Sequence, residues 1–193
     1  MIKHSCTALA VSGCILVLPY LGLVSSAGSP RPREKATKEW FYAVVAGEVN
    51  GAIDVTIVIE GYTTREEAQL LVKASRSTDR GALERALNKM NKGHFQFWTN
   101  PSTSLRIVQS VPTEKGRKIS LVADRRQHWD EAPGSSVRSA DYPYTYVELD
   151  LDKKGKGTGL WMPFARVRFD DNGLLKIDNY SVRPWRLGSV TRM

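Results

Sequence analysis

The sequence predicts an α+β fold, a curved antiparallel sheet or incomplete β-barrel of about eight strands, with a two-helix insertion after the second strand. Three observations support this class. Apolar and polar residues alternate at residues 52–60 and in several later segments, which is typical of half-buried strands. Between residues 63 and 93 the apolar spacing becomes that of helices. From residue 94 onward, short strand-like segments separated by tight turns indicate a meander.

The first two strands are predicted to form a hairpin. Residues 40–49 read as a strand, Asn50-Gly51 supplies a turn that tolerates positive φ, and residues 52–60 return. The apolar side chains of the returning strand that share one face are Val55, Ile57 and Ile59. We therefore expect one face of this hairpin to be buried and the other to meet solvent.

Two short helices are predicted next. Thr64 followed by Glu67 has the spacing of a reciprocal N-terminal cap, in which each side chain bonds the other residue's backbone N–H. Ser77-Thr78-Asp79 predicts the start of the second helix and Gly93 its stop. Its apolar face recurs at helical spacing in Leu83, Leu87 and Met90. The pair could cover one sheet face or an open end of a barrel.

The remaining chain is predicted to be β-structure. Strands are expected at residues 94–99, 105–111, 117–123, 144–151, 158–169, 174–180 and 183–190. Turns at residues 113–116, 153–156 and 171–173 each contain a glycine, which suits tight connections. The connection at residues 125–140 is much longer than a turn, and we interpret it as an ordered flap over one end of the sheet.

The N-terminus has the pattern of a secretory signal peptide. Lys3 precedes a mostly apolar run, and Ser25 and Ala27 are the small residues of a cleavage site, which predicts cleavage near Ala27. A lipoprotein start at Cys14 is disfavoured, because the most apolar residues follow that cysteine. An uncleaved membrane anchor is the other alternative, since the run approaches a bilayer-spanning length. The expected organisation is a signal peptide at 1–27, a flexible linker at 28–38 and a single β-rich domain at 39–193. The mature protein is expected to be periplasmic or secreted.

Charge and cysteine content restrict the possible partners. The formal net charge is +8, and the positive residues are spread along the chain without the basic, aromatic-interleaved stripe typical of nucleic-acid binding. Cys6 and Cys14 both lie in the predicted signal peptide, so the mature protein is expected to have no disulfide and no cysteine nucleophile. The partners that fit are an anionic envelope surface or an apolar or aromatic small ligand. No cofactor motif is present, and none is expected.

The polar segment after residue 124 holds the candidates for catalysis. His128 could act as a general base with a carboxylate and a serine of the same segment. The catalytic candidates are His128, Asp130, Glu131 and Asp141. The sequence contains no G-x-S-x-G motif to expose a serine and no HExxH spacing for zinc, so we predict neither a serine elbow nor a metal site. A polar connecting loop explains these residues equally well.

Aromatic residues supply the candidates for binding. Tyr142, Tyr144 and Tyr146 alternate along a predicted strand, which should place their rings on one side. Trp129 and Trp161 lie before and after this strand in the sequence. Such rings can line a ligand pocket, or they can pack across neighbouring strands of a sheet. Both interpretations remain open from the sequence.

Several short motifs together resemble a family of uncharacterised exported bacterial proteins. The motifs are Gly61-Tyr62-Thr63-Thr64 with Glu66-Glu67, Ala82-Leu83, Ala86-Leu87, Asp124-Arg125, Arg138-Ser139, Asp141-Tyr142-Pro143 and Glu148-Leu149. The resemblance covers most of the chain after the predicted signal peptide. It implies export and a shared fold. Because no activity is assigned to that family, the resemblance implies no catalytic residue.

Two functions follow as hypotheses. The first is a non-catalytic binding protein of the cell envelope or extracellular space. The alternative is a small envelope or extracellular hydrolase that uses His128 with a carboxylate from the same loop.

Overall fold

The computed structural model describes residues 38–193 apart from 48–50, 80, 98–100, 125–141 and 181–182. The strands are β1 (Glu39–Gly47), β2 (Gly51–Ile59), β3 (Gly93–Phe97), β4 (Thr103–Pro112), β5 (Gly116–Asp124), β6 (Tyr144–Asp152), β7 (Lys156–Phe169), β8 (Leu175–Tyr180) and β9 (Trp185–Arg192). The helices are α1 (Arg65–Ser75) and α2 (Ala82–Asn88), both inserted between β2 and β3 as predicted. None of the helices in these ranges is long and apolar enough to cross a membrane.

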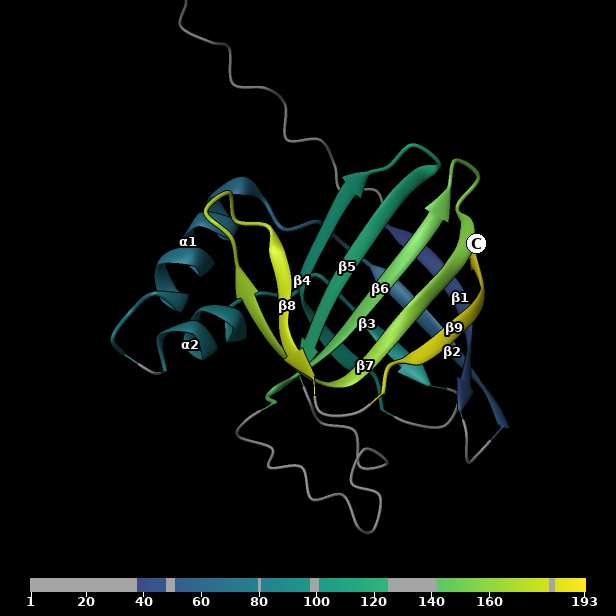
Figure 1. Cartoon of the computed structure of the whole chain (residues 1–193), viewed down its shortest axis with the longest axis horizontal. Coiled ribbons are helices and arrows are strands. Elements are labelled where there is room, and N and C mark those ends of the chain that lie inside the picture. Colours follow the sequence, from purple (N-terminus) through teal and green to yellow (C-terminus); the bar gives the residue numbers. More distant parts are fainter. Residues whose placement is uncertain (1–37, 48–50, 80, 98–100, 125–141, 181–182) are drawn as a thin grey trace, which may run out of the picture. The chain divides into compact units, whose positions relative to one another are not determined.

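Eight strands form a closed antiparallel barrel, and β8 lies outside it as an extra strand (Figure 1). The ring runs β6-β5-β4-β3-β2-β1-β9-β7 and closes through the pairing of β6 with β7. The 14-residue β7 makes closure possible, because it pairs with β6, with β9 and, towards its end, with β8. The prediction of an antiparallel barrel is confirmed, but the prediction that the barrel is incomplete is wrong.

The interior of the barrel is an apolar core. Alternate residues of each strand face inwards, so that Phe41 and Val45 of β1 and Ile57 of β2 are completely buried. At the centre, the indole ring of Trp161 lies between two phenylalanine rings, with centroid distances of 4.7 Å to Phe95 and 4.8 Å to Phe97. Both contacts have the edge-on geometry that aromatic pairs favour.

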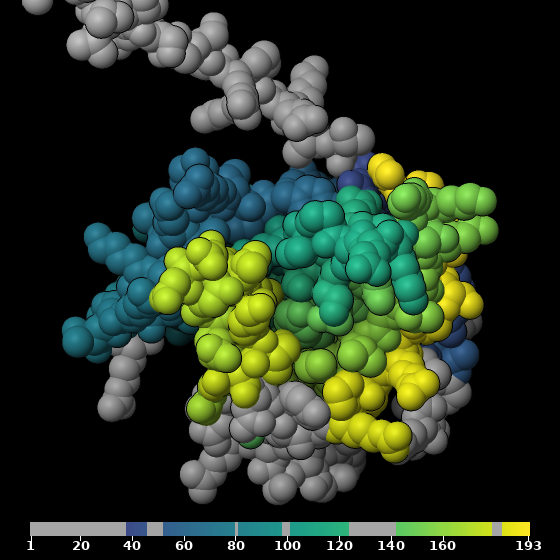
Figure 2. All heavy atoms as spheres, turned by 45° about the horizontal axis from the view of Figure 1, so that its top comes forward, coloured from purple at the N-terminus to yellow at the C-terminus, as the bar shows by residue number. Residues whose placement is uncertain are grey.

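A second apolar cluster lies on the outside of the barrel, beneath the helices and the β7–β8 hairpin. Leu71 of α1 and Leu87 of α2 pack in this cluster with Ile107 of β4 and Val122 of β5. A register shift between Leu105 and Ile107 turns β4, so that Leu105 faces the interior and Ile107 faces the helices. Figures 1 and 2 both show β8 beside the helices, so these elements together form one flank of the molecule.

The two helices begin by different means. The Thr64 hydroxyl accepts from the backbone N–H of Glu67 at 3.2 Å, and the Glu67 carboxylate accepts from that of Thr64 at 2.8 Å. This reciprocal cap confirms the prediction for α1. The second helix starts later than predicted, at Ala82, because Asp79 uses its carboxylate to bond the N–H of Gly81 in a turn.

Candidate anion-binding groove

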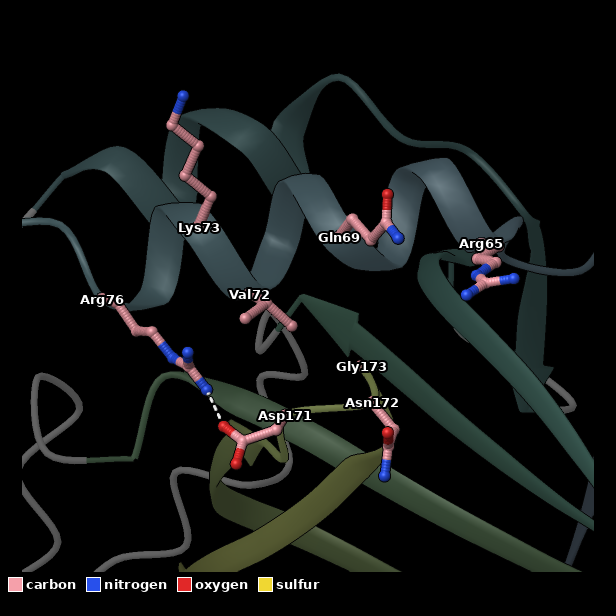
Figure 3. Close-up of a pocket in the computed structure, with 8 residues that line it drawn as sticks. All are labelled: Arg65, Gln69, Val72, Lys73, Arg76, Asp171, Asn172 and Gly173. Carbon is pink, nitrogen blue, oxygen red and sulfur yellow. Dashed lines mark hydrogen bonds and ion pairs between the residues drawn. The ribbon is translucent and has the colours of Figure 1, made fainter. Parts of the chain in front are cut away.

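An open groove of about 760 Å³ lies between α1 and the turn that joins β7 to β8 (Figure 3). Its lining residues are Arg65, Gln69, Val72, Lys73, Arg76, Asp171, Asn172 and Gly173. The first four come from α1, Arg76 is its C-cap, and the last three belong to the turn, so two segments far apart in the sequence form its two walls. Among the described residues, those that line the groove are cationic, amide-bearing, apolar or acidic, and none is a histidine, cysteine, serine or threonine.

The helical wall follows from residue spacing. Each lining residue of this wall lies three or four positions from another, so they fall on one side of an α-helix. They are residues 65, 69, 72, 73 and 76. Ala68 and Leu71 are buried beneath this side and hold α1 to the barrel. The helix therefore presents two arginines and a lysine in a row, with the amide of Gln69 and the half-buried Val72 between the ends.

The opposite wall is a tightly bonded turn. The Asp170 carboxylate accepts from the backbone N–H groups of Asn172 at 3.0 Å and of Leu174 at 2.9 Å. Gly173 has a φ of +79°, and a Cβ added there would lie 3.0 Å from the Cβ of Ala68 on α1. Glycine at this position thus permits both the left-handed backbone and the close approach of the turn to the helix.

A glutamine side chain anchors the turn to the barrel. The amide of Gln109 on β4 donates to the carbonyl of Gly173 at 2.7 Å and accepts from the N–H of Leu175 at 2.8 Å. Two hydrogen bonds from one amide fix the start of β8 relative to β4. The second wall of the groove is therefore held in place before any ligand arrives.

The electrostatic character of the groove is cationic. Arg65, Lys73 and Arg76 carry positive charges, whereas Asp171 is the one carboxylate among the lining residues. Asp171 is ion-paired with Arg76, and the side chains are 90% and 58% exposed respectively. In the described ranges, neither Arg65 nor Lys73 makes an ion pair. The pKa of neighbouring Glu66 is lowered mainly by hydrogen bonds to backbone and to Thr64, and to a smaller extent by the charge of Arg65. Two cations are thus available to an anionic ligand, and a third is held only by an exposed carboxylate.

A separate charged cluster lies at one end of the barrel. The Arg117 guanidinium bonds the Glu39 carboxylate, and Tyr62 donates to the same carboxylate at 3.2 Å. Burial is the largest influence on Glu39 and by itself would raise the pKa of this carboxyl. The hydrogen bond from Arg117 and the charges of Arg117 and Arg192 together outweigh burial, so the pKa of Glu39 is lower than its ordinary value. The pKa of Tyr62 is raised to about 12, mainly by burial and secondly by the negative charge of Glu39. Because every member has a partner, we interpret this cluster as structural.

Tyr146 belongs to another bonded group, on the outer face of the barrel. Its hydroxyl lies 2.9 Å from the Ser120 hydroxyl and donates to the Glu148 carboxylate at 3.2 Å. Burial raises the pKa of Tyr146 to about 12, so the phenol stays protonated at neutral pH. Lys118 pairs with Glu148 at 2.9 Å. Among the described residues, this group thus joins a serine hydroxyl, a phenol and an ion pair in one set of contacts.

The aromatic residues predicted to bind a ligand are divided between two layers. Tyr144 and Tyr146 face outwards and pack in the cluster beneath the helices, whereas Trp161 points into the barrel. The strand register explains this division, because Trp161 is paired with Val147 and Met162 with Tyr146. Tyr142, which precedes β6, is half-buried beside the guanidinium of Arg166, 5.9 Å from the ring centroid.

The predicted catalytic residues lie outside the part of the chain that the structure describes. The candidates outside the described residues are His128, Asp130, Glu131 and Asp141, together with the predicted binding residue Trp129. Within the described ranges, no group of three or more histidine, cysteine, aspartate or glutamate side chains could hold a metal ion.

The groove itself was not predicted from the sequence. The signal on the helical wall was present, since Arg65, Lys73 and Arg76 recur at helical spacing. The turn at Asp171–Gly173 gave no comparable signal, because its position beside α1 depends on the path of β7. Comparison of the chain with known protein families, with curated proteins and with solved structures finds no match.

Proposed function

We propose that this is an exported, non-catalytic binding protein of the cell envelope or extracellular space, and that the groove between α1 and the β7–β8 turn binds an anionic ligand. Export, the division into signal peptide, linker and β-rich domain, and membership of the uncharacterised exported family remain predictions from the sequence. The proposal of an anionic ligand is consistent with the net charge of +8.

The observation that carries the proposal is the imbalance of charge in a rigid groove. The groove is lined by three cationic side chains and a single carboxylate, and that carboxylate is itself largely exposed. The lining also contains the amides of Gln69 and Asn172, which can donate hydrogen bonds to an anionic or polar group. Cations with adjacent amide donors on preorganised walls are suited to holding an anion.

The packed interior supports a site outside the barrel. An eight-stranded barrel is just wide enough either for its own side chains or for one small ligand. Here the contacts of Trp161 with Phe95 and Phe97 fill the centre with aromatic rings. An apolar ligand in the interior would have to displace these rings, whereas a ligand in the groove displaces only solvent.

The test is binding of three anionic probes by the exported protein: an acidic peptide, an oligogalacturonate and inorganic phosphate. The double variant Arg65→Gln/Lys73→Gln should bind the preferred probe about tenfold more weakly, because each exposed charge contributes up to about 1 kcal/mol. The matched control is Lys153→Gln/Lys154→Gln, which removes the same charge from the exposed β6–β7 turn. Equal loss in both variants, or no binding of any probe, would contradict the proposal.

A further inference from the structure

We infer that the ligand of the groove is an extended acidic peptide segment whose two carboxylates lie about four residues apart. This inference rests on the proposed function, and it adds the chemical class and the spacing of the ligand. The possible occupant is restricted by three features of the groove: the separation of its cations, the nature of its centre, and the ion pair already present in it.

The two arginines lie at opposite ends of the groove, and Lys73 lies nearer the Arg76 end with its side chain extending away from the turn (Figure 3). Arg65 and Lys73 are eight residues apart on α1, which corresponds to about 12 Å along the helix axis, and Arg76 is nearly one turn further. A single small anion can therefore contact the cations of only one end. A ligand that uses both ends must be elongated and must carry two negative groups about 12 Å apart.

An extended peptide has this spacing. Its backbone advances about 3.3 Å per residue, so side chains four positions apart are separated by about 13 Å. These two side chains also lie on the same face of the extended chain, because the side-chain period is two. Two acidic residues at positions i and i+4 would thus reach Arg65 and the Lys73–Arg76 end together.

The centre of the groove fits a peptide backbone. Gln69 of α1 and Asn172 of the turn each offer an amide that can both donate and accept a hydrogen bond, as backbone N–H and C=O groups require. Val72 supplies a small apolar contact between them. The described lining residues of the groove include no aromatic ring. Sugar rings commonly stack on aromatic rings, so this lining favours a peptide over an anionic glycan.

The ion pair of Arg76 with Asp171 is compatible with a carboxylate ligand. It shows that a carboxylate can bond the guanidinium of Arg76 within the groove. Both side chains are largely exposed, and exposed ion pairs stabilise a fold only weakly. A peptide carboxylate can therefore replace Asp171 at Arg76 without a large cost, and Asp171 acts as a weak internal competitor.

The experiment compares two peptides of identical composition, one with glutamates at positions i and i+4 and the other with adjacent glutamates. We expect the spaced peptide to bind about fivefold more tightly, since it alone reaches both ends of the groove. Arg65→Gln should abolish this preference. Asp171→Asn should strengthen binding of the spaced peptide about twofold to fivefold, because it releases Arg76. Thermal unfolding checks that each variant is folded, and both positions are exposed.

The outcomes separate this inference from the proposed function. Equal affinity for the two peptides, with loss of both in Arg65→Gln/Lys73→Gln, would overturn the spacing and leave an anion-binding groove. Tighter binding of an oligogalacturonate than of the spaced peptide, dependent on the same cations, would overturn the peptide class. Groove-independent binding of every probe would overturn both the inference and the proposed function.

Discussion

Glu39→Gln should destabilise the protein by about 2 kcal/mol at neutral pH. Glu39 is the carboxylate on which the charged cluster at one end of the barrel converges. Its side chain is 9% exposed and that of Arg117 is 26% exposed. The substitution keeps the shape of the side chain and an acceptor for Tyr62, but it removes the charge opposite Arg117.

The magnitude follows from the burial of the pair. Removing one partner of a fully buried ion pair lowers the free energy of unfolding by about 3–5 kcal/mol, because the other charge is left buried and uncompensated. An exposed pair contributes only about 0–1 kcal/mol. The Glu39–Arg117 pair is mostly buried, but Arg117 retains some solvent, which places the expected loss between these limits. The matched control is Glu60→Gln, whose exposed pair with Lys38 should contribute less than about 0.5 kcal/mol.

The effect should also depend on pH. The pKa of Glu39 is lower in the folded protein than its ordinary value of about 4.3 in an unfolded chain. The charged Glu39 therefore contributes its full stabilisation of the fold at pH values above this unfolded-state pKa. This stabilisation is lost as the pH falls through the lower folded-state pKa. The difference in free energy of unfolding between wild type and Glu39→Gln should therefore shrink below about pH 4. Urea denaturation at pH 7 and in acid measures this difference directly. A loss below about 0.5 kcal/mol at pH 7 would refute the reasoning, as would a difference that grows on acidification.

Three further predictions concern the helix cap, the groove wall and export. Thr64→Ala should lower the free energy of unfolding by about 1 kcal/mol, because the cap of α1 is lost, and unchanged urea denaturation would contradict the cap. Gly173→Ala should destabilise by about 1–2 kcal/mol, since its φ is +79° and the new Cβ would crowd Ala68; an unchanged melting temperature would contradict this. Protein recovered outside the cytoplasm should have an intact mass that begins at Gly28, and a lipid-modified Cys14 or the full chain would contradict cleavage near Ala27.

Local features of the fold could be predicted from the sequence because their causes are local. Thr64 and Glu67 are three residues apart, so the spacing alone predicted the cap that the structure contains. The alternation of Val55, Ile57 and Ile59 predicted a half-buried strand, and all three side chains are buried in the barrel. The start of α2 was placed too early, since Asp79 competes by bonding the turn at Gly81 instead of capping the helix.

Closure of the barrel could not be predicted in the same way. It depends on β7 pairing with both β6 and β9, and these pairings join residues that no periodicity connects. The same limit applies to the groove. The basic face of α1 is visible in the sequence, but its second wall comes from residues about 100 positions later, held by Gln109 of a third element. For the tyrosines, alternation predicted a shared side for Tyr144 and Tyr146, but not that this side packs beneath the helices.

The most direct test of the binding groove is to map the contacts of the spaced acidic peptide by the changes that it causes in the amide chemical shifts of the protein. We predict that the chemical-shift changes caused by the peptide are concentrated in α1 and in the turn at Asp171–Gly173. These changes should disappear in the double variant Arg65→Gln/Lys73→Gln. Shifts confined to the lysine-rich β6–β7 turn, or to residues of the barrel interior, would contradict the groove as the site of binding.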